Sequence, residues 1–233
     1  MPKLNEQVYR NLRQALICGR WTPGRAVSLR SLAIEQAVSP MPIRDAVSRL
    51  VAECALELKD RRIFVPAMSE QRLLDLIELR LAIEPKLAGR AIALITQEKL
   101  QQIRQLNIVN NQSIESGDIE GYILSNYRFH RAIFGRSGST ALVPILEQVW
   151  MQLGPYARIV YGRLGTSHLA DDKHDHAIAA LASGDETGLR GAIEADILDG
   201  RTLLMAKPFN LREATHDRVN DREAETAFFL DQT

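Results

Sequence analysis

Two side chains that could hold a small ion or ligand between them stand four residues apart in the segment NYRFHRAIF, residues 126–134. If this segment is helical, Asn126 and His130 share a face, because positions i and i+4 of a helix are neighbours. A lone histidine on a half-apolar helix is also commonly packed and hydrogen-bonded without any ligand. The spacing alone therefore leaves both interpretations open, and the surrounding elements must decide between them.

The composition of the whole chain is that of an ordinary soluble protein, with 233 residues of which 45% are hydrophobic and 25% charged. The N-terminal segment MPKLNEQVYR has no apolar core, and no run of about 18 uncharged apolar residues occurs. We therefore expect a cytoplasmic protein with no membrane partner. Cys18 and Cys54 lie far apart without a metal-binding spacing, which is typical of reduced, packed thiols.

Helical periodicity dominates the chain after Ser69. Apolar residues at helical spacing predict helices over residues 70–94, 97–116, 119–134, 141–161, 171–182 and 185–206. Helices of this number and length, joined by short turns, form an antiparallel bundle with its own core. Asn126 and His130 fall on the third of these helices.

The N-terminal third has a different pattern and a different charge. Residues 5–19, 28–37 and 43–53 read as three short helices, with Ser28 as an N-cap of the second and Ser39-Pro40-Met41-Pro42 as the opening of the third. Residues 56–65 read as two strands around a basic turn. Arg61 and Arg62 at that turn would face phosphate or a minor groove. Residues 1–66 contain 11 Lys and Arg against 6 Asp and Glu, a net charge of +5, so this part is expected to meet a polyanion.

The order and spacing of these N-terminal residues resemble the DNA-binding domain of the GntR family of bacterial transcription regulators. The matching positions are Tyr9, Ile17, Gly19, Trp21, Pro23, Gly24, Leu32, Ala33, Val38, Ser39, Pro42, Ile43, Arg44, Asp45, Ala46, Val47 and Leu50. The resemblance implies a winged helix-turn-helix in which Arg30, Ser39, Arg44 and Arg49 contact DNA.

Three positions depart from the family pattern. Pro40 stands where the family usually has arginine, so a DNA contact is lost and the operator sequence is expected to differ. Cys54-Ala55 replaces the usual Gly-Leu after the recognition helix. Ile63 follows Arg62 where the wing usually has glycine, so the wing tip needs another turn.

Residues 70–205 resemble the FCD domain, the effector-binding domain of the FadR subgroup of the same family. The matching motifs are Glu78-Leu-Arg80-x-x-Ile83-Glu84-Pro85, Phe129-His130-Arg131-Ala132-Ile133 and His174-x-x-Ala177-Ile178-x-Ala180-Leu181-x-x-Gly184-Asp185. In that family one aspartate and three histidines commonly hold a metal near a carboxylate effector. The resemblance implies that Asn126, His130, His174 and Asp196 occupy these four positions, with Asn126 replacing the aspartate and Asp196 the last histidine.

This ligand set suits Zn, Ni, Mn or Fe, with the amide oxygen of Asn126 as a weak ligand and open positions for an effector carboxylate. A site that has lost its metal and binds the effector by hydrogen bonds is the alternative. Arg80 is the candidate for the effector carboxylate because guanidinium offers a bidentate fork. Its alternative role is an i,i+4 salt bridge with Glu84.

We therefore predict a mainly α protein with a winged helix-turn-helix in residues 1–67, an all-helical effector-binding bundle of about six helices in residues 68–206, and a tail in residues 207–233. The predicted function is effector-controlled, sequence-specific binding of double-stranded DNA rather than catalysis. A homodimer on a two-fold-related operator is expected, because one recognition helix reads only a half-site. The alternatives are a metal-dependent enzyme that uses His130, His174 and Asp196, and a constitutive DNA-binding protein without an effector.

Overall fold

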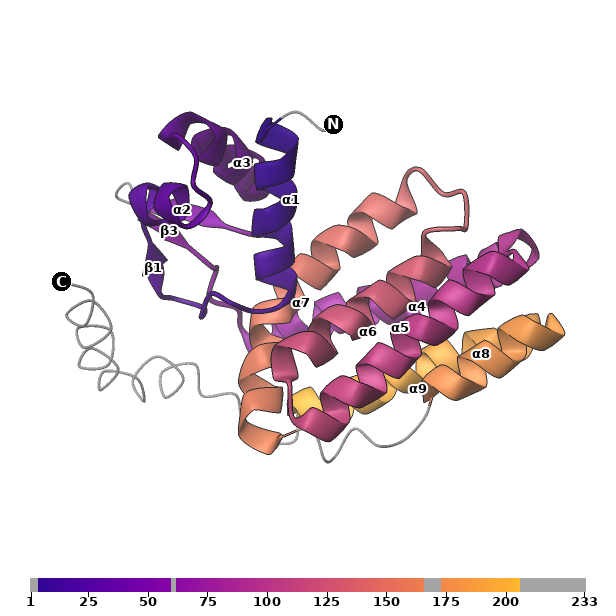
Figure 1. The fold of residues 1–233 in the computed structure, drawn as a ribbon. Helices are drawn as coiled ribbons and strands as arrows, with labels where there is room; N and C mark the ends of the chain where they lie inside the picture. Colours follow the sequence, from indigo (N-terminus) through magenta and orange to yellow (C-terminus); the bar gives the residue numbers. More distant parts are fainter. Residues whose placement is uncertain (1–3, 60–61, 166–172, 206–233) are drawn as a thin grey trace.

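The computed structural model describes residues 4–59, 62–165 and 173–205 (Figure 1). In these ranges the chain is mainly helical, with one small sheet near its N-terminus. The predicted fold class, a winged helix-turn-helix followed by an all-helical bundle, is confirmed. Arg61 and the tail 207–233, on which predictions were made, lie outside the described residues.

Three helices make up most of the N-terminal unit: α1 (Leu4–Ile17), α2 (Leu29–Glu35) and α3 (Pro40–Ala52). Ser28 caps α2 as predicted, since its hydroxyl oxygen accepts a hydrogen bond from the Ser31 backbone N–H at 3.0 Å. Helix α3 begins at Pro40 with Ser39 as its N-cap, in agreement with the predicted opening by Ser39-Pro40-Met41-Pro42. Prolines are compatible with a first helical turn because the N–H groups they lack would have no partner within the helix.

The sheet is antiparallel, with strand order β1-β3-β2. Its strands are β1 (Ala26–Val27), β2 (Glu57–Lys59) and β3 (Arg62–Phe64). The central strand places Ile63, which is fully buried, opposite Val27 on one side and Leu58 on the other. The β2–β3 hairpin is the predicted wing, and its basic residue Arg62 is exposed.

Six α-helices form the C-terminal bundle within the described residues. They are α4 (Glu70–Ala91), α5 (Gln97–Ser116), α6 (Ile119–Phe134), α7 (Leu142–Leu164), α8 (Lys173–Ser183) and α9 (Glu186–Met205), with a 3₁₀ turn at Ile92–Leu94. Ser69, Thr96 and Asp118 each cap the following helix through a side-chain oxygen. Gly117 ends α5 with φ +72°, a backbone conformation that glycine adopts without strain.

The N-terminal unit packs directly against the bundle. One hydrophobic core lies within the bundle, whereas a second contains side chains of α1 and α3 together with Leu87, Tyr127 and Trp150 of the bundle. Helix α1 contacts α7 (Figure 1), and Arg13 of α1 pairs with Glu147 of α7 at 3.2 Å. A change inside the bundle can therefore reach α1 through packed side chains.

The contact between α1 and α7 requires a glycine at position 154. A Cβ atom on Gly154 would press against the carbonyl oxygens of Leu16 and Ile17 at the end of α1. We expect Gly154→Ala to lower the free energy of unfolding by about 1–3 kcal/mol, because overpacking strains the contact. Gly162→Ala in the same helix is the control, since no described atom lies within 4 Å of its Cβ position. That variant should gain up to about 1 kcal/mol from helix propensity, and equal shifts in denaturant unfolding would contradict the expectation.

Candidate metal and effector site and DNA-binding surface

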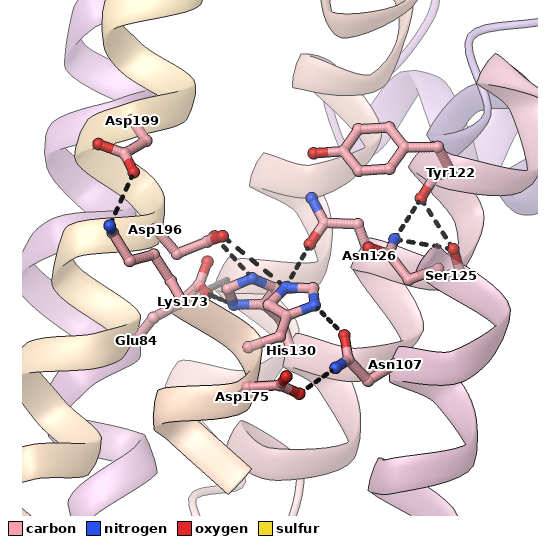
Figure 2. Close-up of polar contacts among 12 residues, drawn as sticks. Glu84, Asn107, Tyr122, Ser125, Asn126, His130, Lys173, Asp175, Asp196 and Asp199 are labelled. Carbon is pink, nitrogen blue, oxygen red and sulfur yellow. Dashed lines mark hydrogen bonds and ion pairs between the residues drawn. The ribbon is translucent and has the colours of Figure 1, made fainter. Parts of the chain in front are cut away.

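His130 lies in the interior of the bundle between two carboxylates from different helices. It belongs to the buried face of α6 and is only 1% exposed. Its Nδ1 is 3.0 Å from Oε2 of Glu84 on α4, and its Nε2 is 2.9 Å from Oδ2 of Asp196 on α9. Figure 2 shows Asp196 and Asn126 directed toward the imidazole groups from opposite sides.

His174 of α8 turns its Nε2 toward the same centre. This atom is 3.2 Å from Oδ1 of Asn126 and 3.7 Å from Oδ1 of Asp196. Its ring stacks on Phe129 at a centroid distance of 3.8 Å. The other nitrogen, Nδ1, is 3.0 Å from Oδ1 of Asn107.

Asn107 selects the tautomer of His174. Its Nδ2 donates a hydrogen bond to Oδ1 of Asp175 at 2.7 Å, so its Oδ1 is the atom that faces His174 (Figure 2). An amide oxygen accepts, and Nδ1 of His174 must therefore carry the proton. In the neutral ring, the lone pair of Nε2 then points toward Asp196 and Asn126, as a metal ligand requires.

Charges in this cluster are strongly coupled. Burial disfavours the charged form of His130. The negative charges of Asp196 and, to a smaller extent, Glu84 favour that form more strongly and raise the pKa of His130 to about 9. Burial would raise the pKa of Asp196, but His130, with smaller contributions from His174 and Arg80, holds it well below its usual range. Burial likewise opposes ionisation of Glu84, yet Arg80 and His130 lower its pKa. The metal-free cluster is thus a protonated His130 held between two carboxylates.

The donor set fits a divalent transition metal. His130, His174 and Asp196 each offer one ligand atom, and these three atoms lie within 4.8 Å of one another. Among the described residues, neither nitrogen of His130 makes a well-aligned hydrogen bond despite the short ion pairs. Buried polar atoms usually have such partners, and a cation at this point would satisfy Nε2. Two imidazoles and a carboxylate are ordinary ligands of Zn and its neighbours.

Arg80 pairs with Glu84, which was the alternative to effector binding. Its Nε is 2.6 Å from Oε1 of Glu84, and its guanidinium lies over the Trp150 ring at 3.8 Å. One guanidinium nitrogen, Nη2, is nevertheless buried without a hydrogen-bond partner in the described structure. The salt bridge therefore leaves part of the guanidinium available to a ligand.

Two polar residues contact the histidines in ways that the sequence analysis did not predict: Glu84, expected only as a partner of Arg80, and Asn107. Glu84 is only 1% exposed and accepts a hydrogen bond from Trp150 Nε1 at 3.0 Å, while Asn107 is 4% exposed and positions His174. A signal was present, because Glu84 is seven residues after Ile77 and Asn107 is seven after Leu100, so both follow the buried stripe of their helices. Polar residues on such a stripe indicate internal partners.

The residues predicted to contact DNA differ in whether their side chains already pair with other residues of the protein. Arg30, Ser39 and Arg44 are exposed, and in the described residues neither arginine forms an ion pair. Arg49 instead lies over the Tyr9 ring at 3.5 Å and pairs with Glu6 at 3.2 Å and Glu53 at 3.4 Å. The geometry therefore ties Arg49 to α1 and leaves Arg44 free on the outer face of α3.

A winged helix-turn-helix packed on a helical bundle with buried polar side chains is the architecture of a DNA-binding regulator with a sensor domain. Comparison with protein families agrees. The model for bacterial regulatory proteins of the gntR family matches residues 4–65, and the model for the FCD domain matches residues 75–198. The chain belongs to the GntR family, and its combination of domains fits the FadR-like subgroup.

Relatives along most of the chain are transcription regulators. The HTH-type transcriptional regulator McbR of Escherichia coli K12 is 28% identical over 210 residues, which are 89% of this chain and 95% of McbR. The repressor GlaR of the same organism is 29% identical over 173 residues, or 72% of this chain and 79% of GlaR. The solved structure of E. coli McbR/YncC superposes with a TM-score of 0.84 at 27% identity, covering 88% of this chain and 99% of that one.

These comparisons identify a DNA-binding transcription regulator and give no support to an enzyme. A putative GntR regulator from Rhodococcus sp. RHA1, at 19% identity and a TM-score of 0.69, shares the fold. None of the helices in the described ranges combines the length and apolarity needed to cross a membrane.

Proposed function

We propose that the chain is a one-component regulator whose affinity for its operator is set by a small carboxylate bound in the FCD domain, next to a divalent metal. The observation that carries this proposal is the convergence of His130, His174 and Asp196 from three helices on one buried point, with Asn126 beside them. A bound ion would supply a Lewis acid for the effector carboxylate.

The contacts of the second ring nitrogen of each histidine support the metal part of this proposal. A ligating histidine usually gives its other ring nitrogen to a carboxylate or carbonyl, which orients the ring. Here Glu84 faces Nδ1 of His130 and Asn107 faces Nδ1 of His174. Both histidines are thus held with Nε2 toward Asp196.

Contacts from this site lead toward the DNA-binding unit. Glu84 accepts the hydrogen bond of Trp150 Nε1, and the Trp150 ring packs against Arg80 and edge-on to Tyr127. Trp150 and Tyr127 belong to the core that also contains residues of α1. A ligand that engages Arg80 would shift this cluster against α1, so effector and operator would alter each other's affinity reciprocally.

We propose that two copies act together on a two-fold-related operator, with the winged helix-turn-helix in residues 1–67 and the sensor in residues 68–206. One recognition helix reads only a half-site. The arrangement of the two DNA-binding units is then the property that the effector changes.

Metal analysis of protein purified without a histidine tag tests the site. Wild-type protein should carry a transition metal, and His130→Ala and His174→Ala should lose most of it, because each removes an imidazole ligand. His176→Ala is the matched control, since His176 is exposed on the same helix as His174 and should leave the metal content unchanged. Equal metal content in all four proteins would show that His130 and His174 are not metal ligands.

Operator affinity measured on the same proteins tests the function. At fixed salt, one member of a panel of small mono- and dicarboxylates should change wild-type affinity by about 5- to 150-fold, the usual range of such coupling. His176→Ala should respond like the wild type, and His174→Ala should not respond. If no carboxylate changes the affinity of the wild-type protein for the operator, the proposed control by a carboxylate effector is wrong.

A further inference from the structure

The recognition helix α3 begins in an unusual way for a DNA-binding element. Its first and third residues are Pro40 and Pro42, which have no backbone N–H, and the hydroxyl of the N-cap Ser39 makes no capping bond. The N–H groups at a helix N-terminus normally offer an anion site that can hold a phosphate. Here two of those donors are missing, so the start of α3 offers little to a phosphate.

An apolar side chain occupies this position instead. Met41, the second residue of α3, is a large apolar residue whose surface is 64% exposed to solvent. It shares an exposed stripe with Arg44 and Ser48, three and seven residues further on. The opposite face of α3, which carries Ile43, Ala46, Val47 and Leu50, is buried and fixes the orientation of that stripe.

The surroundings of Met41 favour DNA as the partner that covers it. N-terminal residues of the second helix of a helix-turn-helix reach base edges in the major groove. Arg44, which also projects from the exposed stripe, forms no ion pair among the described residues, and residues 1–66 carry a net charge of +5. In the major groove, the apolar group on a base edge is the C5-methyl of thymine.

We propose that Met41 reads a thymine methyl in each operator half-site, one base pair from the base that Arg44 contacts. This inference rests on the proposed function, because it requires an operator. Three residues of helix rise by about 4.5 Å, close to the 3.4 Å between stacked base pairs. The flexible, polarisable thioether side chain of methionine packs readily against a methyl group.

Replacement of thymine by deoxyuridine removes only the methyl group and tests this contact. Operators are first selected from random duplex DNA with the full-length protein, and each thymine is then replaced in both half-sites. At one position of the half-site, replacement of the two symmetry-related thymines should weaken wild-type binding by about fourfold for each methyl group removed. This is the value expected for one buried methyl group. In Met41→Ala the same replacement should have no effect.

Two controls separate this contact from general effects. Leu94→Ala, which changes an exposed apolar residue of the bundle, should respond to deoxyuridine like the wild type. Met41 is exposed, so Met41→Ala should unfold at the wild-type temperature.

Three results would overturn the inference. The first is that uracil changes binding of the wild type and of Met41→Ala by the same factor at every thymine. The second is that Met41→Ala changes the oligomeric state rather than the base preference. In both cases a selected operator leaves the proposed function intact. If selection gives no preferred sequence at all, the proposed function fails, and the inference fails with it.

Discussion

Replacing Glu84 by alanine is expected to lower the free energy of unfolding of the metal-free protein by about 3–5 kcal/mol, the typical result of removing one partner from a buried ion pair. Glu84 is only 1% exposed and lies within 3.0 Å of Arg80, His130 and Trp150 atoms. Its loss leaves the Arg80 guanidinium and a charged His130 in the interior with less compensation. Denaturant unfolding in the presence of a chelator measures the effect without a contribution from metal.

Glu186→Ala is the matched control for this prediction. Glu186 pairs with Arg190 at 2.6 Å on the surface, with side chains 52% and 39% exposed. Exposed pairs of this kind contribute about 0–1 kcal/mol, so this variant should unfold almost like the wild type. Similar losses in Glu84→Ala and Glu186→Ala would mean that the buried cluster does not stabilise the bundle as its burial indicates.

Much of the fold was predictable because local signals mark the helix ends. Thr96 and Asp118 cap α5 and α6, and Gly117 in the left-handed conformation ends α5, so the predicted ranges 97–116 and 119–134 agree with the structure. Helix α3 likewise begins where the segment Ser39-Pro40-Met41-Pro42 predicted its first turn, because prolines are tolerated there even though apolar periodicity starts only at Ile43.

The candidate site was only partly predictable. Resemblance to the FCD domain placed Asn126, His130, His174 and Asp196 together, and the structure brings all four into contact. The partners Glu84 and Asn107 lie on α4 and α5, and their contacts depend on how these helices pack against α6 and α8. Spacing within one helix does not encode such packing, so only the buried position of the two polar residues could have indicated it.

The same limit applies to the DNA-binding arginines. Family resemblance gives Arg44 and Arg49 equal weight, since it implies a DNA contact for both. The structure separates them, because Tyr9 and Glu6 of α1, more than thirty residues earlier in the chain, contact Arg49 and do not contact Arg44. Because Arg44 is unpaired in the described structure and Arg49 is paired, their alanine variants should affect DNA binding and stability differently.

Arg44→Ala is expected to reduce operator affinity by at least tenfold and to relax base preference at one position of each half-site. A bidentate arginine–guanine pair contributes about 1–3 kcal/mol of discrimination, and a two-fold operator contains two such pairs. Arg44 is exposed and, in the described structure, forms no ion pair, so its removal should leave the thermal unfolding temperature unchanged. Binding to the selected operator and to a scrambled duplex at one salt concentration measures affinity and preference together.

Arg49→Ala should instead affect stability and leave base preference unchanged. Its guanidinium covers Tyr9 at 3.5 Å and pairs with two glutamates, so its removal should lower the unfolding temperature while base preference stays the same. Any loss of affinity should be equal for the operator and the scrambled duplex, because a phosphate contact carries no sequence information. If Arg49→Ala relaxes base preference and Arg44→Ala does not, the outer face of α3 is not the surface that reads the operator.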